Sequence, residues 1–407
     1  MTNLIESSTW ESGIYQLETD DPTLGGQPGF NMGEPVTGHA NAQGQQLANR
    51  TKWLYDNKAN SSDLSDTSDP SKGAGTTSRT VRSKVLEHRS ILDYGSNSNL
   101  SSTVTVAQAA LPAGSSILFT EGQYISNESF VKDVQIESNG KTAVIKAAPS
   151  ATVALKFGRH LPDWDFYLVR GVTIDGNTKL SDGVNFDGDG GADAAFGGRW
   201  SFDKVTFQNC LVGANHRNGN IGNRYRDCEF RINDFGVRHV NSPTEVMHSG
   251  AQYYEGCEFN SNAKAAVYIN DAQEGTGQYT FNNCIIEGNP GFGVFADLHG
   301  LAPFSGIVFD NVWFEQNASS PSVTIDGTPY TPRDIYLKDA KPVFFRNSFL
   351  KSVTLVNSTV IADGCRIDDA NGLILEVDNN SQMICTNVYS NGGTSGASRC
   401  ARGQIRR

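Results

Sequence analysis

The chain has 407 residues, of which 38% are hydrophobic and 19% charged, and its formal net charge is −11. This acidic excess opposes a broad contact with nucleic-acid phosphates, so we expect no nucleic-acid partner. With 42 glycines and 4 methionines, the composition favours strands and turns over a helical bundle. No signal-like N-terminal segment is present and no stretch approaches the ~20 apolar residues that span a bilayer. We therefore expect synthesis in a cytoplasm and no membrane insertion.

Residues 1–60 contain a Gly/Pro turn cluster, DDPTLGGQPGF, followed by the segment HANAQGQQLANRTKWLYDNK. In that segment apolar and small residues recur at helical spacing, namely Ala40, Leu47, Ala48, Thr51 and Leu54. The spacing predicts one short helix. Because such a helix carries little apolar surface, we expect a partner chain or companion domain to cover it.

The rest of the chain divides into three further zones. Residues 61–95 form a polar linker that closes with alternating apolar residues, and residues 96–390 contain a repeated pattern. Residues 391–407 are rich in Gly and Ser and then basic, so we expect a flexible tail.

A nine-residue pattern recurs with an aromatic residue first, Cys or Val fourth and Asn ninth. The copies FQNCLVGAN, YRDCEFRIN, YEGCEFNSN, FNNCIIEGN and FDNVWFEQN begin at Phe207, Tyr225, Tyr254, Phe281 and Phe309. Their spacings are 18, 29, 27 and 28 residues, and a weaker copy, FRNSFLKSV, begins at Phe345. Cys365 and Asn387 mark two further candidates. Such periods favour a parallel β-helix over the alternatives, a β-propeller or an antiparallel sandwich. A spacing of 18 residues is too short for a propeller blade.

We expect each copy to form one strand on one rung, with positions one, four and six pointing into the core. Position nine, always Asn, is expected at a corner, in left-handed geometry and bonded to its own stack. Second strands should follow at Gly236, Ala265 and Gly291.

The cysteines at position four are expected to be reduced and buried. They are Cys210, Cys228, Cys257 and Cys284. No C-x-x-C spacing of a zinc site occurs in the sequence, so we expect no metal at these positions and no cofactor.

Two segments ahead of the repeats resemble parts of bacteriophage tail proteins. YQLETDDPTLGGQPGFN followed by ANAQGQQLANRTKWL is similar to the virion-anchoring segment of tail fibres and tailspikes. Its pattern L-x-x-R-T-x-x-L is formed by Leu47, Arg50, Thr51 and Leu54. DPSKGAGTTSRTVRSKVLEHRSILDYG is similar to the connector before a tailspike β-helix, with D-Y-G at residues 93–95 in place of D-F-G. The repeats resemble the pectate-lyase-like fold.

The resemblance implies an all-β protein, in which a right-handed single-stranded parallel β-helix follows a small N-terminal anchor with one short helix. It implies a homotrimer on the phage virion, attached through residues 1–60 to tail, baseplate or portal-proximal proteins. The implied ligand is a bacterial capsular or O-antigen polysaccharide, which a depolymerase would cleave. The short segment after the last repeat favours a non-enzymatic virion adaptor or adhesin as the alternative.

Strand alternation is expected to place positions two, five and seven on one outer face, where carboxylates gather. The candidate catalytic residues are Glu258, Glu287 and Glu315. From rung and strand spacings we expect Glu287 and Glu315 about 5 Å apart, and Glu258 and Glu287 about 8 Å apart. Retaining glycosidases need about 5 to 5.5 Å and inverting ones about 6.5 to 9.5 Å, so either pair suits an endoglycosidase.

Four residues near these carboxylates are candidates for substrate binding. Trp313 offers an apolar platform for a sugar ring, beside Arg231, Glu229 and Asp310. The alternative is an exposed sheet that Glu side chains simply solvate, balanced in part by Arg226 and Arg231.

A polysaccharide lyase is the second enzymatic alternative, and it requires a base and a cation. The best cluster for that chemistry is Arg238, His239 and His248, although histidines in loops are usually surface residues.

The run DGDGGADAAFGG resembles a calcium loop in that Asp187, Asp189 and Asp193 alternate with glycines. It lacks the closing Glu of that loop, so we expect a surface turn and no metal.

Overall fold

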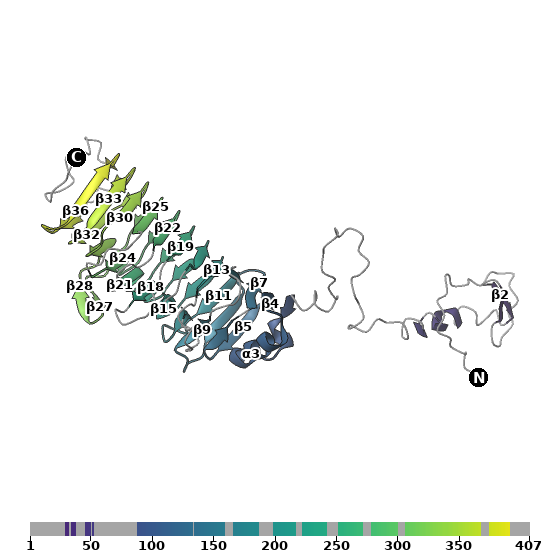
Figure 1. Cartoon of the computed structure of the whole chain (residues 1–407). Coiled ribbons are helices and arrows are strands. Elements are labelled where there is room, and N and C mark those ends of the chain that lie inside the picture. Colours follow the sequence, from purple (N-terminus) through teal and green to yellow (C-terminus); the bar gives the residue numbers. More distant parts are fainter. Residues whose placement is uncertain are drawn as a thin grey trace. The chain divides into compact units, whose positions relative to one another are not determined.

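The computed structural model describes residues 29–31, 34–37, 45–49, 51–52, 88–132, 134–158, 166–186, 198–216, 222–241, 251–271, 278–299, 306–367 and 374–390. The chain forms two compact units, Met1–Val85 and Leu86–Arg407, both drawn in Figure 1.

In the first unit, β1 (Gly29–Asn31) and β2 (Glu34–Thr37) pair as an antiparallel hairpin. Residues 45–49 and 51–52 are helical, inside the segment predicted to form a helix. Gln45, Gln46 and Asn49 are buried, and Leu47 is 56% exposed. Amide side chains thus occupy the buried side of this helix, and Leu47 is left on the exposed side, where the partner expected from the sequence would have to cover it.

The second unit contains three parallel sheets. The 12-stranded sheet is β3 His88–Ser90, β4 Ser115–Phe119, β7 Val134–Ser138, β10 Tyr167–Arg170, β13 Trp200–Asp203, β16 Arg224–Arg226, β19 Gln252–Glu255, β22 Tyr279–Asn282, β25 Ile307–Asp310, β30 Val343–Arg346, β33 Thr359–Asp363 and β36 Gln382–Thr386.

The 11-stranded sheet is β5 Gly122–Ser126, β8 Ala143–Ala147, β11 Val172–Asp175, β14 Thr206–Gln208, β17 Glu229–Arg231, β20 Glu258–Asn260, β23 Ile285–Glu287, β26 Trp313–Glu315, β31 Phe349–Leu350, β34 Arg366–Ile367 and β37 Tyr389–Ser390.

The 10-stranded sheet is β6 Ser129–Val131, β9 Val153–Phe157, β12 Asp182–Asn185, β15 Val212–His216, β18 Phe235–Asn241, β21 Ala265–Asp271, β24 Phe292–Asp297, β29 Ile335–Lys338, β32 Ser352–Val356 and β35 Ile374–Val377. A hairpin of β27 (Val323–Ile325) and β28 (Thr328–Tyr330) interrupts the succession.

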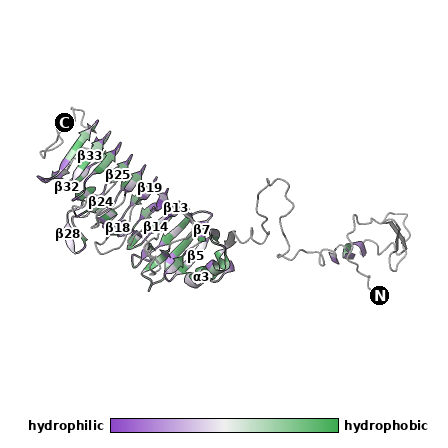
Figure 2. Ribbon diagram, in the orientation of Figure 1, coloured by the Kyte–Doolittle hydropathy of each residue, from purple (hydrophilic) through white to green (hydrophobic). Residues whose placement is uncertain are grey.

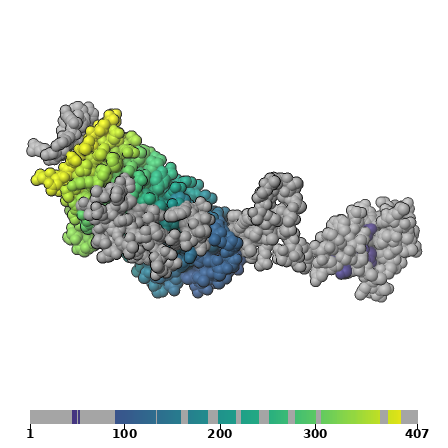
Figure 3. All heavy atoms as spheres, in the orientation of Figure 1, coloured from purple at the N-terminus to yellow at the C-terminus, as the bar shows by residue number. Residues whose placement is uncertain are grey.

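The chain visits the three sheets in turn, and each visit pairs in parallel with the previous rung, so the predicted parallel β-helix is confirmed. The rungs follow one another in sequence order along the unit (Figure 3). The second strands predicted at Gly236, Ala265 and Gly291 correspond to β18, β21 and β24.

Each nine-residue copy spans two strands, and the prediction of a single strand is wrong. Position one lies on the 12-stranded sheet and position six on the 11-stranded sheet. Between them, position three turns the chain with a positive φ, as at Asp227, Gly256, Asn283 and Asn311. Asn, Asp and Gly are the residues that accept this left-handed geometry most readily, so the bend is written into the repeat.

The first copy was assigned in the wrong frame. Phe207 pairs with Phe230, which is position six of the next copy. The true first residue is Phe202, which pairs with Tyr225, so the first spacing is 23 residues instead of 18. The 18-residue spacing between the first two copies therefore does not exist, and it is the parallel pairing of successive strands that excludes a propeller or an antiparallel sandwich.

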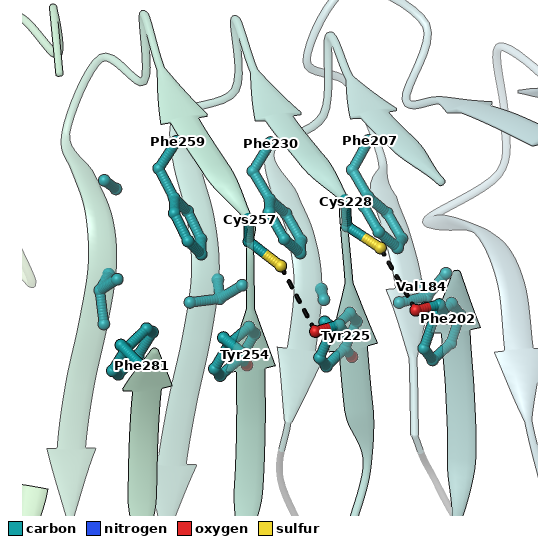
Figure 4. Close-up of a cluster of buried hydrophobic side chains, with 14 of the residues drawn as sticks. Val184, Phe202, Phe207, Tyr225, Cys228, Phe230, Tyr254, Cys257, Phe259 and Phe281 are labelled. Carbon is teal, nitrogen blue, oxygen red and sulfur yellow. Dashed lines mark hydrogen bonds between the residues drawn. The ribbon is translucent and has the colours of Figure 1, made fainter. Parts of the chain in front are cut away.

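Positions one, four and six fill the core, as predicted. The position-one rings stack almost parallel, with centroids 4.8 Å apart for Tyr225 and Tyr254 and 4.7 Å for Tyr254 and Phe281. Figure 4 shows this column beside a second column of position-six rings. The position-four thiols of Cys228 and Cys257 each donate to a backbone carbonyl of the preceding rung. They are free and buried, as expected for small core side chains.

Position nine forms a buried ladder of asparagines at the corner before the 10-stranded sheet. Asn262 Nδ2 donates to the Phe230 carbonyl at 3.0 Å and to Asn289 Oδ1 at 2.9 Å. Asn233 and Asn289 repeat the arrangement. The expected stack of asparagines is confirmed. The residue in left-handed geometry is position eight, such as Ser261, and not the asparagine itself. This turn at position eight lets the side-chain amide of position nine point into the rung.

A helix that the sequence analysis missed covers the first rungs. The short η1 (Ile91–Asp93) leads to α3 (Leu100–Ala110), which Asn99 caps and which packs on β5 and β6. Gln108 donates to the Phe130 carbonyl and accepts from the Lys132 amide, which satisfies part of the edge of β6. Gly95 is required here because a Cβ would lie 2.5 Å from Thr103 Oγ1.

Figure 2 shows hydrophobic and hydrophilic residues mixed along the sheets. The main hydrophobic cluster fills the interior of the rungs. A second cluster joins Tyr268 and Phe295 of the 10-stranded sheet to Val323 and Ile325 of the β27–β28 hairpin, so the outer face of that sheet is partly apolar.

Candidate functional site

The carboxylates predicted to be catalytic lie on the outer face of the 11-stranded sheet. Glu287 of β23 pairs in register with Glu315 of β26, as the repeat predicts. Glu258 of β20 pairs with Ile285, which places it on the diagonal from Glu287, also as predicted. Adjacent rungs are about 4.8 Å apart. The backbones of Glu287 and Glu315 are therefore about 4.8 Å apart, close to the about 5 to 5.5 Å between the carboxyl groups of retaining glycosidases.

These three carboxylates differ in their contacts. Asn260 Nδ2 donates to Glu258 at 2.6 Å, and Trp313 Nε1 donates to Glu315 at 2.9 Å. Within the described ranges, the Glu287 carboxylate accepts no hydrogen bond and forms no ion pair. Glu287 is thus the most available of the three to an external ligand.

Glu229 and Arg231, both predicted to bind substrate, are engaged with their neighbours. The Arg231 guanidinium donates to Glu229 at 3.2 Å and to Gln208 Oε1 at 2.8 Å. Thr206 donates to Glu229 at 3.2 Å, and Lys141 Nζ lies 3.5 Å from it. A substrate that uses either residue must displace these contacts.

Trp313, the predicted sugar platform, is 40% exposed. Its ring stacks on Phe349 of the next rung, with centroids 4.5 Å apart and 19° between the planes. At most one face of the indole is therefore open to a sugar ring.

Asp310 lies on a different sheet from the other predicted site residues. It belongs to β25 of the 12-stranded sheet, while Glu315 belongs to β26 of the 11-stranded sheet. The separation arises at Asn311, whose φ of 53° turns the chain between the two strands. The expectation that positions two, five and seven share one face is therefore wrong.

The 12-stranded sheet has its own outer face, and a hollow of about 520 Å³ lies on it. Its lining residues are Phe166, Arg199, Ser201, Gly222, Arg224, Tyr225, Arg226, Ala251, Tyr253 and Glu255. The Arg224 guanidinium lies 3.9 Å from the centre of the Phe166 ring, and Arg199 lies 5.9 Å from it. The first hollow thus combines arginines with an aromatic wall.

A second hollow of about 370 Å³ adjoins the first, because Tyr253 lines both. Its other lining residues are Gln278, Thr280, Asn282, Val308, Asp310, Phe344 and Arg346. Asn282 Nδ2 donates to the Tyr253 hydroxyl at 3.4 Å, and Arg346 lies 5.7 Å from the Phe344 ring centre. We call the two hollows together the groove.

Two carboxylates lie in one column of the groove. Glu255 pairs with Asn282, and Asn282 pairs with Asp310, so the carboxylates are two rungs apart. That separation is about 9.6 Å between backbones. It is just above the about 6.5 to 9.5 Å that separates the carboxyl groups of inverting glycosidases, so the two side chains need to lean only slightly toward each other. Asn347 Nδ2 donates to Asp310 at 3.3 Å.

The groove was not predicted because its lining residues come from or just before strands β13, β16, β19, β22, β25 and β30 and from the residue before β10, and they share no single position of the repeat. Tyr253 and Phe344 stand one residue before position one, outside the nine-residue pattern. Phe166 precedes β10, before the first copy of the repeat. The sequence signal for the groove is that an aromatic or arginine residue stands directly before position one in several copies.

The predicted lyase cluster is not formed, because His239 points into the core. It is fully buried, its ring stacks on His216 with centroids 4.5 Å apart, and its Nε2 is 3.0 Å from the Tyr254 hydroxyl. Burial and the neighbouring His216 lower the pKa of His239 well below its ordinary value. A base enclosed in this way cannot reach a polysaccharide. His248 lies outside the described residues.

Asp187, Asp189 and Asp193 of the calcium-like run also lie outside the described residues, as do residues 391–407. Across the described ranges, no cluster of three His, Cys, Asp or Glu side chains could hold a metal ion. None of the helices in those ranges has the length and apolar content of a bilayer-spanning segment.

No family model matches this sequence. No curated protein matches it either. Solved structures similar to this one include tailspike protein 3 of bacteriophage CBA120, at 13% identity and a TM-score of 0.46, over 98% of this chain and 73% of that protein.

Another similar structure is the A-module of the mannuronan C-5 epimerase AlgE4 of Azotobacter vinelandii, at 14% identity and a TM-score of 0.44, over 74% of this chain and 95% of the module. ORF18 of Geobacillus virus E2 is similar at 13% identity and a TM-score of 0.45, over 75% of this chain. The match spans 58% of that viral protein, less than two-thirds of its length.

Proposed function

We propose that this chain is a tailspike-type receptor-binding protein that attaches to a bacterial surface polysaccharide and cleaves it as an endoglycosidase. The observation that carries the proposal is the groove on the 12-stranded sheet. Its aromatic side chains, Tyr253, Phe344 and Phe166, offer apolar surface to sugar rings, and its charged side chains can bond hydroxyl groups. Hollows of about 520 and 370 Å³ lie in the usual range for small-ligand sites.

For the cleavage step we propose that Glu255 and Asp310 act as general acid and general base across the groove. A general acid protonates the leaving glycosidic oxygen, and the base deprotonates a water that attacks the anomeric carbon from the other side. The backbone separation of about 9.6 Å leaves room for that water and predicts inversion.

The second candidate pair is the one from the repeat, Glu287 and Glu315, with Glu258 on the diagonal. These carboxylates are one rung apart and suit a retaining mechanism. In this proposal Trp313, Arg231 and Glu229 contact the sugar beside them. The lining of the groove does not include Glu258, Glu287 or Glu315, so the two pairs act on separate faces.

One experiment tests the activity and chooses between the pairs. Purified chain is mixed with capsular and O-antigen polysaccharides, and new reducing ends and ultraviolet absorbance are measured. Reducing ends without absorbance are expected, because hydrolysis forms no double bond. The same assay on Glu255→Gln, Asp310→Asn, Glu287→Gln and Glu315→Gln assigns the pair. An unsaturated product contradicts the endoglycosidase proposal, and binding without cleavage supports the adhesin.

We further propose that residues 1–60 attach the chain to the phage tail and that the β-helix unit assembles as a homotrimer. The tail-attachment proposal rests on the resemblance of the N-terminal motif, of which Leu47 and Thr51 lie in the described helix. Light scattering after size-exclusion chromatography measures the mass directly. Three times 44.0 kDa is expected, and a monomer at micromolar concentration contradicts the trimer.

A further inference from the structure

The first hollow of the groove carries positive charge on a protein whose net charge is −11. Three arginines line it, Arg199, Arg224 and Arg226, against the single carboxylate of Glu255. The second hollow, by contrast, holds one arginine and one carboxylate, Arg346 and Asp310. The two halves of the groove therefore differ in charge.

Two of these guanidinium groups lack a carboxylate partner. Within the described residues, neither Arg224 nor Arg226 forms an ion pair. Arg170, on the outer face of the same sheet, shows the ordinary arrangement, because its Nε donates to Asp203 at 2.8 Å. Three arginines around a single carboxylate repel one another, and an anionic ligand would relieve that repulsion.

Phe166 helps to hold the arginines in place. Arg224 lies over its ring at 3.9 Å and Arg199 at 5.9 Å from the ring centre, so one aromatic ring contacts two cations. A guanidinium that stacks on a ring keeps its in-plane N–H groups free to donate to two oxygens of an anion. The hollow is thus arranged for a planar or tetrahedral oxyanion rather than for a neutral hydroxyl.

We propose that the first hollow binds the anionic group of an acidic sugar, a carboxylate or a phosphate, and that the second hollow binds a neutral sugar beside it. This inference deepens the proposed function and rests on it. It specifies the substrate as a polysaccharide whose repeat contains acidic and uncharged units. Glu255 at the border of the hollows then lies near the bond between the two kinds of sugar.

The test measures binding of the full chain by isothermal titration calorimetry, so it does not depend on cleavage. An acidic polysaccharide that the chain recognises is compared with the same polymer after its carboxyl groups are reduced to alcohols. We expect at least tenfold weaker binding of the reduced polymer. Arg224→Gln and Arg226→Gln should each weaken binding of the native polymer at least threefold and leave binding of the reduced polymer unchanged. Arg170→Gln is the matched control and should bind both polymers like the wild type.

Arg226→Lys distinguishes charge attraction from bidentate hydrogen bonding, because lysine keeps the positive charge but cannot donate two parallel hydrogen bonds to one anion. It should restore part of the affinity that Arg226→Gln loses. Competition with glucuronic acid and with glucose 6-phosphate identifies the anion, since the group that fits the hollow competes at lower concentration. Melting temperatures equal to that of the wild type show that the variants are folded.

The inference is overturned if native and reduced polymer bind equally well and both Arg→Gln variants bind with wild-type affinity. In that case the proposed function still stands. Competition by neither anion, with both Arg→Gln variants binding like the wild type, also overturns the inference. If no bacterial polysaccharide binds at all, the proposed function itself fails.

Discussion

The 11-stranded and the 12-stranded sheets present side chains from the same rungs, and their outer faces differ in kind. The first carries a ladder in which Glu229 and Arg231 bond to each other and Trp313 stacks on Phe349. The second is hollowed, and within the described residues Arg224 and Arg226 beside the hollow form no ion pair. Side chains that satisfy one another stabilise a surface, while unsatisfied ones around a concavity favour a ligand.

We expect the greatest change in the cleavage rate, and this rate distinguishes the outer face of the 12-stranded sheet from that of the 11-stranded sheet. Loss of a general acid or base lowers kcat by roughly 10² to 10⁴-fold. We expect Asp310→Asn and Glu255→Gln to lose cleavage to this extent, and Glu287→Gln to keep the wild-type rate within about threefold. Initial rates of reducing-end formation measure the difference. The reverse pattern assigns the chemistry to the 11-stranded sheet.

The corner that follows the 11-stranded sheet depends on the asparagine ladder. Asn262→Ala removes one buried amide, so the Phe230 carbonyl loses its Asn262 donor and the Asn233 side-chain amide loses the acceptor Asn262 Oδ1. We expect a loss of about 3 kcal/mol in the free energy of unfolding, because the remaining buried groups lose their bonds. Urea denaturation measures it.

Asn311→Gly is the matched control for that variant. It removes an exposed bond to Asn283 and keeps a residue that accepts a positive φ. We expect a change of about 0.5 kcal/mol or less. Equal losses in the two variants would show that the ladder adds nothing beyond an ordinary surface contact.

Acid should destabilise the core beneath both faces through His239. Its pKa is lowered in the folded protein by burial and by His216, while the unfolded chain takes up a proton near pH 6.5. The unfolded state binds more protons below that pH, so the free energy of unfolding decreases as the pH falls through about 6.5. The loss is at most about 1.4 kcal/mol per pH unit for this group.

Melting temperatures between about pH 7.5 and pH 5 test this dependence. The melting temperature of His239→Phe should decrease less with falling pH than that of the wild type. His299→Gln, which replaces an exposed histidine, should show the same decrease as the wild type. Identical slopes for all three proteins would exclude His239 as the source of acid sensitivity.

We expect the least change from a variant on the outer face of the 11-stranded sheet, where Arg231 and Glu229 already bond to each other. Arg231→Gln removes an ion pair in which the Arg231 side chain is 41% exposed. We expect the free energy of unfolding to change by less than about 0.5 kcal/mol and polysaccharide binding to stay unchanged. A tenfold loss of binding would place the sugar on the 11-stranded sheet.

The repeat was sufficient to predict the fold, the inward positions and the pairing of Glu287 with Glu315, because stacking requires equivalent residues to recur. It did not reveal the bend at position three, although Asp227, Gly256 and Asn283 are the residue types that permit it. The misassigned frame at Phe207 arose because an aromatic, a cysteine and an asparagine there match the pattern by chance.

The groove could not be predicted in the same way. Its walls join Phe166, Tyr253 and Phe344, which are distant in the sequence and occupy no position that the repeat marks. Helix α3 was missed for a local reason. Its segment LSSTVTVAQAA contains β-branched residues that favour strands, and its N-terminal signal is the single residue Asn99.

We propose that the ligand lies on the 12-stranded sheet. A crystal structure of the Asp310→Asn variant with an oligosaccharide of the recognised polymer tests this position. We expect sugar rings against Tyr253 and Phe344, with the acidic group between Arg224 and Arg226. Sugar density over Glu287 and Glu315, with the groove empty, would contradict it.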